Sequence, residues 1–183
     1  MSNKAWLFLL FLSLIWGGSF YFIAEGVKVV PPLTLVFYRI FFAGLVLYLI
    51  SLWFRRRLPK KSDFWIKVAV MALLNNIIPF TLIAWGQQTI SGGLASILNS
   101  NTAFAAVFLA VVFIPSEKLE IRRVAGTLIG ICGVTIVTGL DVLKELTLTS
   151  LSQLAVLLAS VSYALGSIWG QAKLSVYEPM DIA

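Results

Sequence analysis

The sequence predicts an all-α fold, a polytopic bundle of about six transmembrane helices. Three observations carry this prediction. Of the 183 residues, 60% are hydrophobic and only 12% are charged, whereas a soluble globular domain carries roughly 25% charged residues. Apolar stretches of the length that crosses a bilayer, about 20 residues, recur along the chain. The basic residues gather in a few loops between these stretches. Lipid is therefore the expected solvent.

Prolines and polar stretches separate the predicted spans. Pro31 and Pro32 mark the first turn, because proline lacks an N–H donor and disfavours helix at the preceding residue. The polar, glycine-rich stretch 87–93 divides an uncharged run that is too long for one helix, and Pro115 ends that run. The six predicted spans are residues 5–24, 33–54, 68–86, 94–114, 124–140 and 152–172.

The fifth span contains small residues at a helical spacing. Gly126 and Gly130 lie four residues apart, which lets helix backbones approach closely in a membrane. Cys132, the only cysteine, is expected to pack there as a small apolar residue.

The distribution of basic residues predicts the orientation. With the N-terminus in the cytoplasm, eleven of the 14 basic residues fall on the cytoplasmic side of an inner (plasma) membrane, as the positive-inside rule requires. The basic loops are thus explained by topology and by contacts with anionic lipid, and no nucleic-acid partner is expected. The predicted inside loops are 55–67 and 115–123, and the outside loops are 25–32, 87–93 and 141–150.

A weak internal repeat accompanies this helix pattern. A shift of 147 residues pairs identical residues, namely Leu7 with Leu154, Leu10 with Leu157, Ser13 with Ser160, Val29 with Val176 and Pro32 with Pro179. Residues 1–140 then form one five-helix repeat, and residues 141–183 form a linker and the first helix of a second, incomplete repeat. An odd number of spans per repeat would invert the second copy, as in inverted-repeat transporters.

Several motifs resemble one family along the entire chain. They are Trp16-Gly17-Gly18-Ser19-Phe20, Pro31-Pro32-Leu33 followed by Arg39 and Ala43, Ile90-Ser91-Gly92-Gly93-Leu94-Ala95, and Glu117 followed by Gly126 and Gly133. In this order and spacing they resemble the EamA-type permeases of the drug/metabolite transporter superfamily. One departure is Thr102, which stands where family members often have proline.

The resemblance implies ten helices in two inverted five-helix repeats, with substrate in a central cavity and no ATP hydrolysis. The chain ends where the repeat predicts a seventh helix. Two interpretations stay open, the N-terminal portion of a longer transporter and a naturally short gene product. For this chain alone we expect no competent monomeric transporter, with a homodimer as one arrangement that would supply a second repeat.

Together these observations predict a secondary transporter that moves small organic metabolites, amino acids or drug-like molecules across the inner membrane by alternating access. The alternative is a non-transporting membrane scaffold or assembly subunit. An enzyme is not expected, because the chain has no histidine, no clustered metal ligands and no phosphate-binding motif. No cofactor or metal is predicted, and the expected partners are a small-molecule substrate and membrane lipid.

Polar and aromatic residues within the spans are the candidates for a substrate cavity, since polar groups in lipid usually face a bundle interior. Interhelical hydrogen bonding and ordinary helix packing are the alternatives for each of them. The candidates are Ser13, Trp16, Phe20, Asn75, Asn99, Tyr163 and Ser167.

Arg39 is the one charge well inside a predicted span. It could bind an anion, or it could be a structural charge that snorkels to the interface or pairs with Glu25 across the Pro31-Pro32 turn. The structural interpretation is favoured, because Arg39 lies only about 10 Å into its helix at 1.5 Å per residue. In a chain without the rest of the second repeat, the sixth helix is expected to expose Ser160, Tyr163 and Ser167, and to be mobile or to dimerise.

Overall fold

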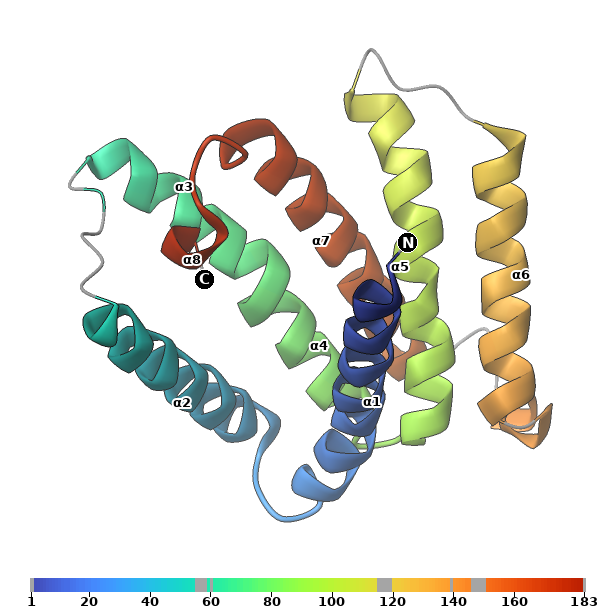
Figure 1. Cartoon of the computed structure of the whole chain (residues 1–183). Helices are drawn as coiled ribbons and strands as arrows, with labels where there is room; N and C mark the ends of the chain where they lie inside the picture. Colours follow the sequence, from blue (N-terminus) through green and yellow to red (C-terminus); the bar gives the residue numbers. More distant parts are fainter. Residues whose placement is uncertain are drawn as a thin grey trace.

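The computed structural model describes residues 2–54, 59, 61–114, 120–138, 140–145 and 151–182, and within them helix is the only regular secondary structure (Figure 1). The predicted all-α class is confirmed. The elements are α1 (Asn3–Gly26), α2 (Pro32–Trp53), α3 (Ser62–Ala72), the π-helix η1 (Leu73–Ile77), α4 (Ile78–Gly86), α5 (Gly92–Phe113), α6 (Ile121–Thr138), the 3₁₀-helix η2 (Leu140–Glu145), α7 (Leu151–Lys173) and α8 (Pro179–Ile182).

Five of the helices in the described ranges are long and apolar enough to cross a bilayer, so the chain is a multi-pass membrane protein. The segment predicted as the fifth span forms α6, which is not among the five. The five are Lys4–Gly26, Pro32–Trp53, Ser62–Gly86, Gly92–Phe113 and Leu151–Lys173.

The helix ends follow from local chemistry. Ser2 caps α1 by accepting a hydrogen bond from the Ala5 N–H at 3.3 Å, and Ser91 caps α5 in the same way. Pro32 opens α2, where a missing N–H costs nothing. The third span begins at Ser62, earlier than the predicted residue 68, because charged residues that end an apolar stretch still continue a helix toward the membrane surface.

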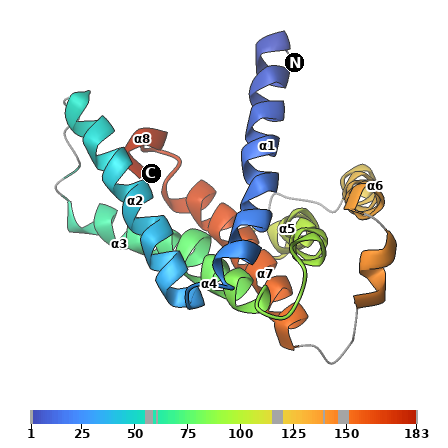
Figure 2. The ribbon, with the colours of Figure 1, turned by 90° about the horizontal axis from the view of Figure 1, so that it is seen from below.

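The helix α7 lies at the centre of the bundle, between α4 and α5 (Figures 1 and 2). Half of the residues in the most apolar 18-residue segment of α7 are buried, whereas only 6% are buried in the corresponding segment of α1 and of α2. The expectation that this helix exposes its polar face is therefore wrong for Ser160, which is 1% exposed. It holds for Ser167, which is exposed, and Tyr163 is half-buried. Ser160 is buried because α7 packs against α4 and α5 on that side, where the Ser160 hydroxyl reaches the Leu98 carbonyl of α5.

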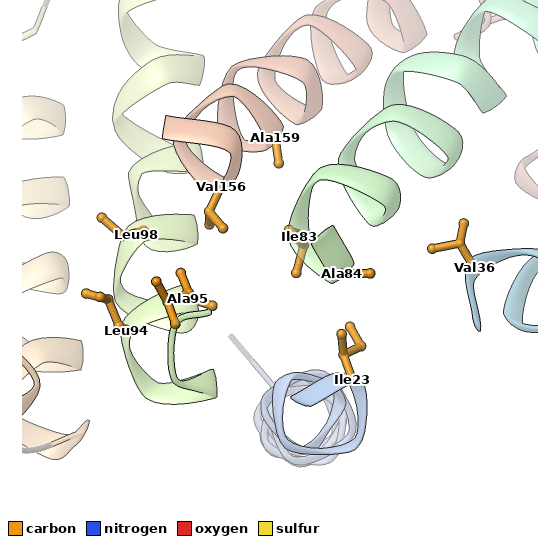
Figure 3. Close-up of a cluster of buried hydrophobic side chains, with 10 residues drawn as sticks. Ile23, Val36, Ile83, Ala84, Leu94, Ala95, Leu98, Val156 and Ala159 are labelled. Atoms are coloured by element: carbon orange, nitrogen blue, oxygen red, sulfur yellow. The ribbon is translucent and has the colours of Figure 1, made fainter. Parts of the chain in front are cut away.

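A buried apolar cluster holds five helices together near one end of the bundle (Figure 3). In the close-up, side chains from α4, α5 and α7 converge, and α1 and α2 each add one labelled residue. This end therefore contains the buried hydrophobic core that the five helices share. The cluster comprises Ile23, Val36, Ile83, Ala84, Ile90, Leu94, Ala95, Leu98, Val156 and Ala159.

The periphery is much less packed. The N-terminal half of α1 projects from the bundle (Figure 2), and α6 stands at the edge beside α5 (Figure 1). A Cβ atom added to Gly126 or Gly130 would meet nothing within 4 Å, so these glycines do not serve a close helix contact within the described ranges. Cys132 is exposed and does not pack as predicted, because no helix of the described ranges covers its face of α6.

Candidate functional site

The third span is interrupted by the π-helix η1 at its two asparagines, Asn75 and Asn76. Pro79 follows and has no N–H to donate. The Ile78 N–H bonds the Leu73 carbonyl, five residues back, so the Leu74 carbonyl has neither of its usual helical donors. The Ser162 hydroxyl of α7 donates to that carbonyl at 2.7 Å. The wide turn is thus stabilised from the neighbouring helix.

Small residues let α7 approach this turn closely. Ser162, Gly166 and Gly170 are spaced four apart on α7, the pattern that brings membrane helices together. A Cβ on Gly166 would lie 3.4 Å from the Asn75 Oδ1 atom, and one on Gly170 would lie 3.3 Å from the Met71 Cε atom. The predicted residue Asn75 therefore lies at the contact with α7, in a π-helix of the kind that is frequent at functional sites.

Asn99 lies where α5 meets α7. The Ser160 hydroxyl is within hydrogen-bond distance of the Leu98 carbonyl at 3.3 Å and of the Asn99 carbonyl at 3.4 Å. The Asn99 Oδ1 atom is buried and has no hydrogen-bond partner among the described residues. An unpaired amide oxygen in the interior costs about 1–3 kcal/mol, so Asn99 can accept a bond from a ligand or a water molecule at a gain in stability.

A polar pocket of about 710 Å³ opens at one end of the bundle, between the end of α1, the loop 87–91 and the start of α5. Gln87 is buried there, and its Nε2 donates to the Phe20 carbonyl at 2.9 Å while its Oε1 has no partner within the described part of the chain. Gly92 permits this arrangement, since a Cβ would lie 3.1 Å from the Phe20 oxygen. The sequence predicts only a break between helices at Gln87 and does not single it out as a site residue.

Glu25 and Arg39 have different partners from those considered for a structural charge. Glu25 accepts from the Lys28 ammonium at 2.5 Å. The Arg39 guanidinium carbon lies 4.0 Å from the centroid of the Phe80 ring, in a cation–π contact between α2 and α4. Phe80 in turn packs edge-on against Tyr163 of α7, with ring centroids 6.4 Å apart. Arg39 is thereby linked to two neighbouring helices.

The remaining candidates are less enclosed. Ser13 is exposed and bonds the Leu9 carbonyl of its own helix at 2.8 Å, and Trp16 is 66% exposed. Ser167 likewise donates to the carbonyl of Tyr163 in its own helix at 3.0 Å. The predicted residues that lie at helix–helix contacts are Phe20, Asn75, Asn99 and Tyr163.

The helical architecture and the motifs can now be compared with known proteins. Residues 3–139 match the EamA-like transporter family. This chain belongs to that family. The resemblance of the motifs is thus confirmed over α1–α6, and the EamA family accounts for the order in which the glycines, prolines and charged loops follow one another.

Individual relatives of this EamA-family chain are also transporters by name. An uncharacterized transporter of Archaeoglobus fulgidus is 30% identical over 146 residues, which cover 79% of this chain and 49% of the relative. The uncharacterized transporter YoaV of Bacillus subtilis is 24% identical over 92% of this chain and 57% of its own length. The uncharacterized inner membrane transporter YedA of Escherichia coli K12 is 26% identical over 87% of this chain and 50% of its own length.

The chain therefore spans about half the length of the curated relatives it matches. No solved structure matches it.

Proposed function

We propose that this EamA-family chain is part of a secondary transporter that moves small organic molecules, namely metabolites, amino acids or drug-like compounds, across the inner membrane by alternating access. The family match over residues 3–139 carries the proposal. The names of the relatives support transport in general, and YedA supports the inner membrane. A small-molecule substrate is the proposed partner.

The packing of α7 supports the proposed repeat organisation. In this proposal residues 1–140 form the first repeat, and α7 is the first helix of the second. Inverted-repeat transporters place their substrate site at the interface between repeats. That interface would be the contact of α7 with α4 and α5, where Asn75, Asn99 and Tyr163 lie.

The transport proposal is tested by flux. The complete gene product is reconstituted in vesicles, and counterflow of a labelled amino-acid mixture is measured. We expect saturable flux that falls about tenfold in Asn99→Ala, because a lost interaction of about 1.4 kcal/mol is a factor of ten. Asn101→Ala is the matched control, since its Nδ2 bonds the Leu98 carbonyl of its own helix at 3.0 Å.

Flux from a non-transporting scaffold would be absent in every variant, and this outcome would contradict the proposal. An equal loss of flux in Asn99→Ala and Asn101→Ala would instead show that Asn99 has no specific role in transport. We also expect residues 1–183 to give no saturable flux as a monomer, because alternating access requires two units that move about a shared site.

The proposed orientation places the N-terminus and loops 55–67 and 115–123 in the cytoplasm. The segment between α1 and α2 and the segment between α4 and α5 lie at one end of the bundle, where Lys28 and Gln88 line the same pocket. The start of α7 is at this end too, because Thr89 Oγ1 donates to Ser152 Oγ at 2.5 Å. The helix ends that flank the basic loops, at α2 and α3 and at α5 and α6, lie at the opposite end of the bundle (Figure 1), and in this proposal the positive-inside rule makes that end cytoplasmic.

Labelling with an impermeant maleimide checks the orientation. In a Cys132→Ser background, which removes the exposed native thiol, a cysteine at Gln88 is expected to react in intact cells. A cysteine at Lys60 is expected to react only after the cells are opened. Reaction of the Lys60 position from outside would reverse the assignment.

A further inference from the structure

A second pocket, of about 540 Å³, lies between α1 and α2 and contains a single charged side chain among its lining residues, Arg39. Its walls are mainly apolar and include Leu14 and Phe22 of α1 and Leu35 of α2. Ser19 adds a hydroxyl group. The pocket therefore offers one positive charge within a hydrocarbon-like wall.

The geometry of Arg39 leaves its hydrogen-bond donors available. Its guanidinium carbon lies above the Phe80 ring, 4.0 Å from the centroid, so the ring covers one face of the group. The five N–H donors of a guanidinium point outward in its plane, where they can grip a carboxylate with two bonds. No hydrogen bond or ion pair joins Arg39 to another residue in the part of the chain that the structure describes.

A cation in a transmembrane helix without a counter-charge is costly, and such groups mark binding or transport paths. Tyr163 packs against the same Phe80 ring, but a phenol supplies no negative charge at neutral pH. Glu25 is already bound to Lys28. Within the described ranges no acidic side chain pairs with Arg39, so an anionic ligand can act as its counter-charge.

The contact with Phe80 of α4 holds the Arg39 guanidinium away from the membrane surface, and this favours a soluble ligand over a lipid headgroup. Arg39 is seven residues beyond Pro32, the first residue of α2, which places it about 10 Å along the helix axis. Lipid phosphates lie at the membrane surface, outside the hydrocarbon core. A small molecule that enters the pocket can reach this depth.

We propose that this pocket binds an amphiphilic carboxylate, with its carboxylate on the Arg39 guanidinium and its aromatic or aliphatic body against Leu14, Phe22 and Leu35. This inference rests on the proposed transport function and names a substrate class for it. It is an alternative to the structural role that the sequence favours for Arg39, and the Glu25 carboxylate considered as a partner in that role is bound to Lys28.

The test is calorimetric titration of the complete gene product in an uncharged detergent. The probes are 4-phenylbutyrate and its neutral analogue 4-phenylbutanol. We expect the acid to bind at least tenfold more tightly than the alcohol. Arg39→Gln is expected to abolish this preference, and Arg39→Lys to weaken acid binding severalfold, since an ammonium keeps the charge and loses the two-bond fork. Lys173→Gln, which changes an exposed basic residue at the end of α7 and outside this pocket, is the control and keeps the preference.

A second pair of variants tests the pocket without touching the charge. Gly18 lines the pocket, and a Cβ there would meet only Phe22 Cε2, at an ordinary 3.8 Å, so Gly18→Leu is expected to fold and to fill the space. Binding of both probes is then lost. Gly17→Leu, one residue earlier and outside this pocket, keeps both.

Equal affinity for the acid and the alcohol, or an unchanged preference in Arg39→Gln, would overturn the inference. Displacement of 4-phenylbutyrate by phosphatidylglycerol at equal concentration would overturn it as well, by making the anion a lipid phosphate. Binding is measured without flux. Acid-selective binding in a protein that shows no flux would therefore support the site and count against transport alone.

Discussion

Replacement of Gly86 by leucine is expected to detach α7 from α4 and to lower the free energy of unfolding by about 3 kcal/mol, the upper range for overpacking. A Cβ at Gly86 would lie 2.9 Å from the Ser152 carbonyl oxygen and 2.9 Å from Val156 Cγ2. Backbone atoms cannot move aside as a side chain does, so the two helices must separate. Unfolding by sodium dodecyl sulfate in mixed micelles, followed by circular dichroism, measures the change.

Gly44→Leu is the matched control, because a Cβ at this helical glycine of α2 would meet nothing within 4 Å. Its free energy of unfolding is expected to change by less than about 1 kcal/mol, in either direction. If Gly86→Leu proves as stable as Gly44→Leu, then α7 does not pack on α4 through this glycine.

Removal of the Ser162 hydroxyl is the second large effect. In Ser162→Ala the Leu74 carbonyl loses its interhelical donor, and we expect the free energy of unfolding to fall by about 2 kcal/mol, within the range for an unsatisfied buried group. Ser167→Ala is the control, since this exposed hydroxyl bonds its own helix. It is expected to stay within about 0.5 kcal/mol of the parent protein in the same unfolding assay.

A double-mutant cycle with Pro79 separates this hydrogen bond from general packing. Pro79→Ala restores an N–H five residues after Leu74, in register with the bond from Ile78 to Leu73. The restored N–H can serve the Leu74 carbonyl, so Ser162→Ala should cost much less in the Pro79→Ala background. Additive losses would show that Pro79 does not cause the need for Ser162.

The sequence predicts best those spans whose ends are marked by a proline or a capping residue. Pro31 and Pro32 give the first turn and Ser91 the cap of α5, because backbone chemistry at these residues is local. The apolar pattern predicts the start of the third span too late, at residue 68. Hydropathy marks the apolar core of a span, whereas the helix continues to Ser62 through Asp63 and Lys67, which form an ion pair on its surface.

The candidate site was predictable only in part. A single residue such as Asn75 or Tyr163 can be selected as polar or aromatic within a span, but its partner depends on how helices pack. The burial of α7 follows from Gly86, Gly166 and the Ser162 hydroxyl meeting specific atoms far away in the chain. A local signal for η1 is present in the sequence, since asparagines followed by Pro79 predict a disturbed helix.

The position of α7 also has a consequence for biosynthesis. Gly86 and Leu74 are translated well before Ser152 and Ser162, the residues of α7 that contact them. At 5–20 residues per second, the 66 residues from Gly86 to Ser152 take roughly 3–13 s to synthesise. During this interval α7 does not yet cover Gly86 or the Leu74 carbonyl, so this surface of α3–α5 stays exposed. In a nascent chain on a ribosome stalled before residue 151, we therefore expect this surface to be cross-linked to membrane insertion factors. The cross-link is expected to disappear once α7 has been synthesised and covers the surface.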